Sequence, residues 1–257
     1  MRGKMLILCL FIVSGCSMPS FVSNQFIDPE KLMKEAQENM MEIESMKTEG
    51  KINFEGNLAG IPYTYNATND SQAKMDEGII IEAYMTIAAE GTGIQPSTEQ
   101  IYFSTSEYGI YDQSTDSWDL TGYLPEEQLL IDLFSTSLNP SNSMNQYFES
   151  KIDTKLDVIG QETIDGVDCV GIYVETNADQ MMSEISPLFS FFAGPAGKLS
   201  TSLTGALVKN LEITYWIGKQ DKLVYKLETK LPTPIFDYTS TLRIYEHNSE
   251  FVSLKDR

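Results

Sequence analysis

Residues Leu211 to Leu231, LEITYWIGKQDKLVYKLETKL, carry the strongest structural pattern in this sequence. Two runs of alternating apolar and polar residues flank a polar segment at 219–222. Strand side chains alternate with a period of two, so each run has one apolar and one mostly polar face. The pattern predicts a β-hairpin in an antiparallel sheet that is covered on one side only. Its apolar face collects Leu211, Ile213, Tyr215 and Ile217 from the first run, and Leu223, Tyr225, Leu227 and Leu231 from the second.

Most of the remaining chain repeats this alternation. The segment Asp165-Gly166 predicts a second hairpin, because glycine accepts positive φ at a tight turn. Further strands are expected at 51–58, 63–68, 74–89, 100–105, 108–112 and 234–247, with the second hairpin spanning 152–164 and 167–176. No internal repeat or linker interrupts them. The chain therefore predicts a single α+β domain over residues 29–257.

Helices are expected between these strands. Asp28 and Pro29 are typical of an N-cap and a first helical position, and an apolar stripe at helical spacing continues to about Met46. Further helices are expected near 125–138, 144–148 and 178–192. The methionines of the first helix favour core packing, and an adaptable ligand-lining face is the alternative.

The charge of the chain limits its partners. Among 257 residues the formal net charge is −19, and the acidic residues are scattered. Nucleic-acid recognition needs clustered Lys and Arg, so no nucleic-acid partner is expected. Such acidity is typical of a protein that is kept soluble after export.

The N-terminus predicts export. Arg2 and Lys4 precede the compact apolar run Met5–Val13, which is too short to span a bilayer as a permanent helix. The following Val13-Ser14-Gly15-Cys16 resembles the lipobox of bacterial lipoproteins, in which the cysteine carries fatty acyl chains such as palmitate. This resemblance implies a signal peptide over 1–15, a lipidated tether over 16–28, and anchoring through Cys16 at the extracytoplasmic face of the cell membrane. An ordinary secretory signal with an incidental cysteine is the alternative.

Catalytic and metal-binding motifs are missing from the sequence. It contains one histidine, His247, so a His-pair metal site is excluded and a His-based triad is not expected. Ser71-Gln72-Ala73-Lys74 matches SxxK without companion motifs, in a stretch expected to form a turn. Once Cys9 leaves with the signal and Cys16 is lipidated, Cys169 remains alone as a small strand residue. We expect no enzyme activity, no cofactor and no metal.

The insert 177–209 is unusually apolar for a connection between two hairpins. Its residues Leu188, Phe189, Phe191 and Phe192 precede the breaker segment 194–197, GPAG. One interpretation is a helix that fills the core, and the other is a mobile lid over an apolar cavity. In the second case the same four residues, with Ile213, Tyr215 and Tyr225 of the hairpin, would line the cavity.

Two segments carry a resemblance to a known family. The run IGQETIDGVDC at 159–169 joins a glycine-bearing strand to an Asp-Gly turn, and YWIGK at 215–219 ends an aromatic strand in a charged turn. With the lipobox and the expected elements, the chain resembles the LolA/LolB-like superfamily. It is most similar to the LppX/LprG-type lipoproteins and related Gram-positive lipoproteins, over about residues 29–247.

This resemblance implies an unclosed antiparallel β-barrel curved around helices that cover its concave apolar face, with a cavity for acyl chains. The family has no catalytic residues to carry over. The implied function is a membrane-anchored carrier of a lipid, a lipopeptide or another hydrophobic ligand. The alternative is a non-catalytic envelope sensor or protein-interaction module that uses the same scaffold with a filled core.

Overall fold

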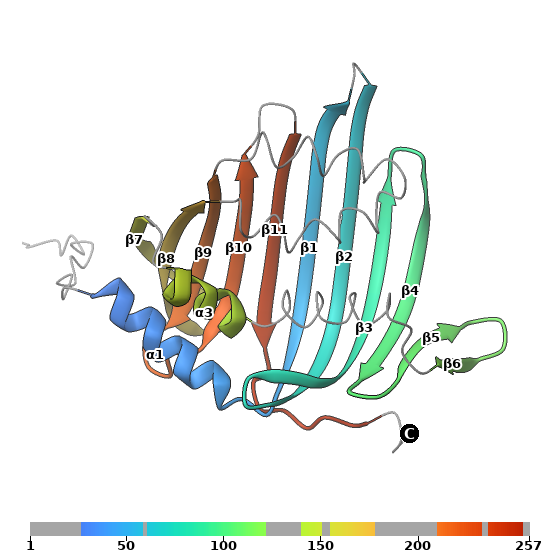
Figure 1. Cartoon of the computed structure of the whole chain (residues 1–257), viewed down its shortest axis with the longest axis horizontal. Coiled ribbons are helices and arrows are strands. Elements are labelled where there is room, and N and C mark those ends of the chain that lie inside the picture. The colour runs from blue at the N-terminus through green and yellow to red at the C-terminus, as the bar shows by residue number, and fades with distance from the viewer. Residues whose placement is uncertain are drawn as a thin grey trace, which may run out of the picture.

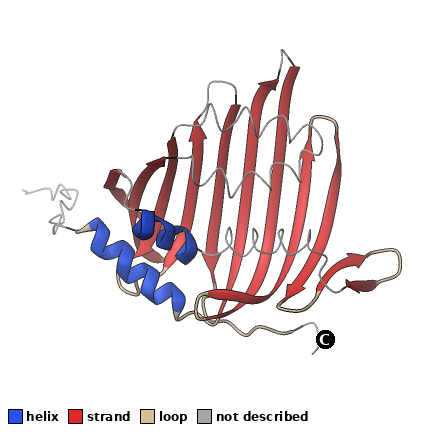
Figure 2. Cartoon of the chain, in the orientation of Figure 1, coloured by secondary structure: helices blue, strands red, loops and turns tan. Residues whose placement is uncertain are grey.

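A single antiparallel sheet dominates the computed structural model, which describes residues 27–58, 61–121, 140–150, 155–177, 210–232 and 236–253 (Figures 1 and 2). Its strand order is β6-β5-β4-β3-β2-β1-β11-β10-β9-β8-β7. The elements of the first half are α1 (Pro29–Met41), β1 (Ser45–Leu58), β2 (Ile61–Asp76), β3 (Ile79–Gly91), β4 (Ile94–Ser104), β5 (Tyr108–Asp112) and β6 (Ser117–Thr121). Those of the second half are α3 (Pro140–Ser150), β7 (Lys155–Ile164), β8 (Val167–Asn177), β9 (Asn210–Gly218), β10 (Val224–Pro232) and β11 (Phe236–Tyr245).

The sheet consists of two meanders, β1–β6 and β7–β11. Antiparallel pairing of β1 with β11 joins them, in a register that runs from Lys47↔Tyr245 to Gly56↔Phe236. The strands β6 and β7 lie at opposite ends of the order and do not pair with each other. The predicted unclosed antiparallel sheet is therefore confirmed.

The helices α1 and α3 lie on one face of the sheet, in front of its β8–β10 region (Figure 1). We call this the helix face and the opposite one the outer face. The predicted helices near 125–138 and 178–192 lie outside the described residues. Coverage of the whole helix face by helices therefore stays a prediction.

The first helix begins as predicted and ends earlier. The Asp28 carboxylate accepts hydrogen bonds from the backbone N–H groups of Glu30 and Lys31, both at 3.1 Å, and Pro29 occupies the first turn. The helix ends at Met41, and Met46 lies in β1. An apolar residue at this position fits the helical stripe and the buried side of the following strand equally well, so spacing alone placed the end too late.

The strands β2 and β3 differ from the prediction in their boundaries. Residues 71–74, expected to form a turn, lie inside β2, whose 16 residues begin at Ile61. The chain turns instead at Glu77-Gly78, where both residues adopt positive φ, inside the stretch 74–89 that was expected to be one strand. Ser71 is polar but buried against β1, and such a paired hydroxyl is indistinguishable from a turn residue in the sequence.

The stretch 211–231 forms the hairpin β9–β10, with one irregularity. The register shifts between Val224 and Lys226, so one residue of β10 is left over in a β-bulge. Val224 is consequently fully buried opposite Ile217, while Tyr225 lies at the bulge and is only half-buried. The prediction that Tyr225 continues the apolar face of this strand is therefore wrong, because a bulge interrupts the alternation.

Candidate functional site

The helix face of the six central strands carries no charge. The register places every second residue of β3, β2, β1, β11, β10 and β9 on this face, and none of these described positions holds Asp, Glu, Lys, Arg or His. The next strand, β4, brings the carboxylate of Glu99 to the same face opposite Ile87. The acidity of the chain is therefore excluded from the centre of the helix face, which suits contact with an uncharged apolar body.

One half of this face is packed. Its apolar residues are almost fully buried and share one hydrophobic cluster with Met33 and Met40 of α1 and with Met144 of α3. A buried polar pair, Thr48 and Ser71, joins its hydroxyl groups at 2.6 Å. We call this region the packed half; it contains Met46, Thr48, Ser71, Ala73, Ala83, Met85, Phe103 and Ile244. The preference for core packing of the methionines is confirmed, except for Met41, which is 45% exposed.

The other half, toward the far ends of β11, β1, β2 and β3, is only partly covered. Its large side chains are half-buried, and they surround the buried residues Ala67 and Phe236. We call this region the half-exposed patch; it contains Ile52, Phe54, Tyr63, Tyr65, Asn69, Ile87, Ala89, Tyr238, Ser240 and Leu242. Phe54 is at its centre, stacked on Phe236 at 5.0 Å and edge-on to Tyr63 at 5.7 Å between ring centroids.

The polar groups of the half-exposed patch are neutral. Burial raises the pKa of Tyr63 and Tyr65, and the pKa of Tyr65 is raised further by its proximity to Tyr63 and Glu99. Burial also raises the pKa of Tyr238, which a hydrogen bond with Ser240 partly offsets. The three phenols are thus protonated at physiological pH and can donate hydrogen bonds without bringing charge to the surface.

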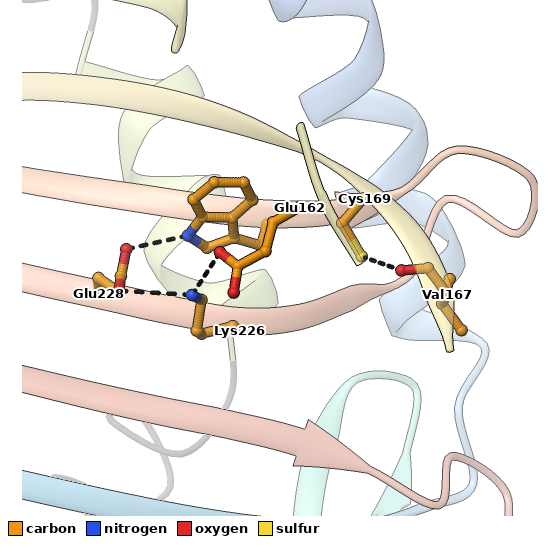
Figure 3. Close-up of polar contacts among 6 residues, drawn as sticks. Glu162, Val167, Cys169, Lys226 and Glu228 are labelled. Atoms are coloured by element: carbon orange, nitrogen blue, oxygen red, sulfur yellow. Dashed lines mark hydrogen bonds and ion pairs between the residues drawn. The ribbon is translucent and has the colours of Figure 1, made fainter. Parts of the chain in front are cut away.

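The outer face over β7–β10 carries the ionic contacts instead. The Lys226 ammonium lies between the carboxylates of Glu162, at 2.8 Å, and Glu228, at 3.5 Å (Figure 3). It also lies 4.7 Å from the ring centroid of Trp216, whose indole N–H donates to Glu228 at 2.9 Å. This network joins three strands and leaves no free cation in it, so it stabilises the sheet rather than offering an anion site.

Cys169, also on the outer face, has a structural environment. Cys169 is buried, its thiol contacts the Val167 carbonyl at 3.5 Å, and burial raises the pKa of the thiol to about 11 (Figure 3). Such a thiol is protonated and unreactive at neutral pH.

Within the described ranges no group of three or more His, Cys, Asp or Glu side chains is arranged to hold a metal ion. None of the described helices is long and apolar enough to cross a membrane.

The predicted ligand residues are distributed differently from the half-exposed patch. Ile213 and Tyr215 are 4% and 1% exposed, inside the hydrophobic cluster. Tyr225 donates to the Asp221 carboxylate at 2.5 Å, and burial together with Asp221 raises its pKa. The remaining predicted positions, Cys16, Leu188, Phe189, Phe191 and Phe192, lie outside the described residues. The sequence-based reasoning missed the patch residues of β1 and β2, although their alternation was recognised, because exposure within an apolar face depends on what covers it.

No family model matches the sequence, and no curated protein matches it. Solved structures do. LprF from Mycobacterium bovis has a TM-score of 0.54 at 11% identity, over 87% of this chain and 94% of that chain. The lipoprotein LppX from Mycobacterium tuberculosis has a TM-score of 0.48 at 12% identity, over 87% of this chain and 96% of that chain. A LolA superfamily protein from Nitrosomonas europaea has a TM-score of 0.31 at 11% identity, over 88% and 96%. The likeness to LprF confirms at the level of the fold the resemblance that the sequence predicted.

Proposed function

We propose that the protein is a membrane-anchored carrier that binds a neutral hydrophobic ligand, a lipid in the first place, on the half-exposed patch. The observation that supports this function most strongly is the division of the helix face. The packed half has the complete burial of a protein core, whereas the half-exposed patch keeps large apolar side chains such as Phe54 and Tyr65 only half-buried. Apolar surface of this kind is stabilised when a hydrophobic partner removes it from water.

Small and large residues stand side by side in the patch. Ala67 pairs with Ala89, and Tyr65 pairs with Gly91, across the β2–β3 ladder. Large aromatic side chains stand beside these small ones on β1 and β11, and this apolar surface is proposed to hold acyl chains. The absence of charge from the described helix-face positions of the six central strands favours an uncharged ligand body, and the fold shared with LprF is compatible with this use.

Anchoring is the second part of the proposal and rests on the sequence. Cys16 is proposed to carry acyl chains, which would hold the domain at the extracytoplasmic face of the cell membrane through the tether 16–28. The insert 177–209 is proposed to act on the same ligand as an apolar lid. Apart from residues 27, 28 and 177, both segments lie outside the described residues, so these assignments are tested by the substitutions given in the Discussion.

A matched pair of substitutions tests ligand binding. Ala89 lies on the helix face and its neighbour Ala88 on the outer face of the same strand, and both are half-buried. We expect Ala89→Phe to fill the patch and weaken binding of a pyrene-labelled hydrocarbon probe at least about tenfold, which corresponds to about 1.4 kcal/mol. Ala88→Phe should leave probe binding unchanged. Equal binding by the two variants, or no binding by the unmodified chain, would contradict the proposed function.

A further inference from the structure

Two poor strand formers face each other in the middle of the longest hairpin. Gly50 of β1 pairs with Asn69 of β2 on the helix face; Gly50 is buried next to the packed half, and Asn69 belongs to the half-exposed patch. Both residue types are depleted in strands, and an interior glycine often marks a close approach. Gly50 is not among the glycines with positive φ, so its backbone conformation does not require glycine. Glycine at position 50 is therefore explained by its lack of a side chain.

The space above Gly50 is occupied by the amide of Asn69. A Cβ atom at position 50 would lie 1.8 Å from Oδ1 of Asn69, 2.8 Å from its Cγ and 3.2 Å from its Nδ2. Any side chain at position 50 would therefore displace this amide. The oxygen is the atom nearest to Gly50, and the nitrogen, which carries the two N–H donors, lies farther from it.

The Asn69 side chain has no hydrogen-bond partner among the residues that the structure describes. The nearest polar neighbours along the helix face, Thr48 and Ser71, bond to each other, and Ile87 flanks Asn69 on β3. Asn69 is half-buried on an apolar face. The Asn69 amide is not among the buried polar atoms that lack a partner, so water reaches it, and a ligand acceptor would replace that water. Residues that disfavour the strand in which they lie, and that have no structural partner there, are typical of functional positions.

We infer that Asn69, held in place by Gly50, donates a hydrogen bond to the ester carbonyl of an acylglycerol bound on the half-exposed patch. This inference rests on the proposed function. A free fatty acid would bring a carboxylate to a face whose charged neighbour is Glu99, and no helix-face position on the six central strands offers a cation. An amide ligand would bring its own N–H group, which needs a second acceptor. An ester carbonyl is neutral and needs only the donor that Asn69 presents.

A pair of ligands that differ only in the carbonyl tests the assignment. The full chain carrying Cys16→Ser is loaded with a pyrene-labelled hydrocarbon, which has no hydrogen-bonding group. The probe is then displaced with 1,2-dioctanoylglycerol or with its diether analogue, 1,2-di-O-octylglycerol. One hydrogen bond contributes about 1 kcal/mol, so we expect the diester to compete about fivefold better than the diether. Octanoate should compete worse than either.

Three variants separate recognition from folding. Asn69→Leu keeps the size of the side chain and should abolish the preference for the diester while the hydrocarbon still binds. Gly50→Ala should do the same although Asn69 is still present, because the new methyl group displaces the amide. Asn66→Leu, on the exposed outer face of β2, is the control and should retain the preference. Thermal unfolding of each variant verifies that it is folded.

The outcomes distinguish this assignment from the proposed function. If the hydrocarbon does not bind to the unmodified chain, both are overturned. If the hydrocarbon binds but diester and diether compete equally, the role of Asn69 alone is overturned. The same holds if folded Asn69→Leu protein keeps the preference for the diester.

Discussion

The substitution Ile213→Ala tests how much the hydrophobic core contributes to stability. The expected loss of unfolding free energy follows from the burial of Ile213. Ile213 is 4% exposed, and its neighbours in the sheet are Val174 of β8 and Thr229 of β10. The substitution removes three carbon atoms, worth roughly 0.8 kcal/mol each in lost burial. A cavity that collapses only in part raises the loss of unfolding free energy to about 3–4 kcal/mol.

The assay is thermal and urea unfolding of the substituted chain. For a domain of this size, 1 kcal/mol corresponds to about 2–4 °C in Tm, so we expect a decrease of roughly 6–15 °C. Lys230→Ala is the matched control, because Lys230 is exposed on the same hairpin and its loss should change stability by less than about 0.5 kcal/mol. Lys226 is unsuitable as a control, since its side chain is 16% exposed and ion-paired. A loss for Ile213→Ala as small as that for Lys230→Ala would refute the assignment of Ile213 to the core.

Three further predictions concern the anchor, the insert and the histidine. Cys16→Ser should release the protein from the membrane fraction or leave an unprocessed precursor, and a processed, membrane-bound variant would contradict lipidation at this position. Phe189→Ala and Phe192→Ala should change uptake of a fluorescent lipid probe with little loss of stability if the insert is a lid, whereas losses of about 3–5 kcal/mol with unchanged uptake would indicate a core role. Burial lowers the pKa of His247 below 6.5, while its Nε2 hydrogen bond with the Val224 carbonyl at 3.1 Å and the nearby Asp221 oppose this shift. The unfolded chain therefore takes up the proton first, so the stabilisation is present above pH 6.5 and is lost as the pH falls through the folded pKa. Between about pH 8 and about pH 5.5 the unmodified chain should lose more unfolding free energy than His247→Gln, and an equal loss would contradict this.

The sequence predicted the hairpins where local signals agree with the sheet. Asp165-Gly166 turns β7 into β8 as expected, and β9 presents Ile213 and Tyr215 to the core. The failures occur where tertiary context decides. The bulge that displaces Tyr225 has no local signal in the sequence. Ser71 is buried although it is polar, because its hydroxyl group forms a hydrogen bond with Thr48.

The half-exposed patch could be predicted only in part from the sequence. The alternation around Phe54 and Tyr65 predicts an apolar face, but spacing does not indicate which half of that face is buried. The pairing of Gly50 with Asn69 depends on the strand register, which is set over the whole β1–β2 ladder. Ile213 and Tyr215, chosen as ligand residues because the hairpin is strongly apolar, lie instead where the core is densest.

Mass spectrometry of organic extracts can show whether the half-exposed patch holds a lipid. The full chain carrying Cys16→Ser is purified under non-denaturing conditions beside the same chain with Ala89→Phe added. We predict that an acyl lipid is extracted from the first protein in near-stoichiometric amount and is strongly depleted in the second. Extracts of the first protein without lipid, or equal lipid in both, would contradict this prediction.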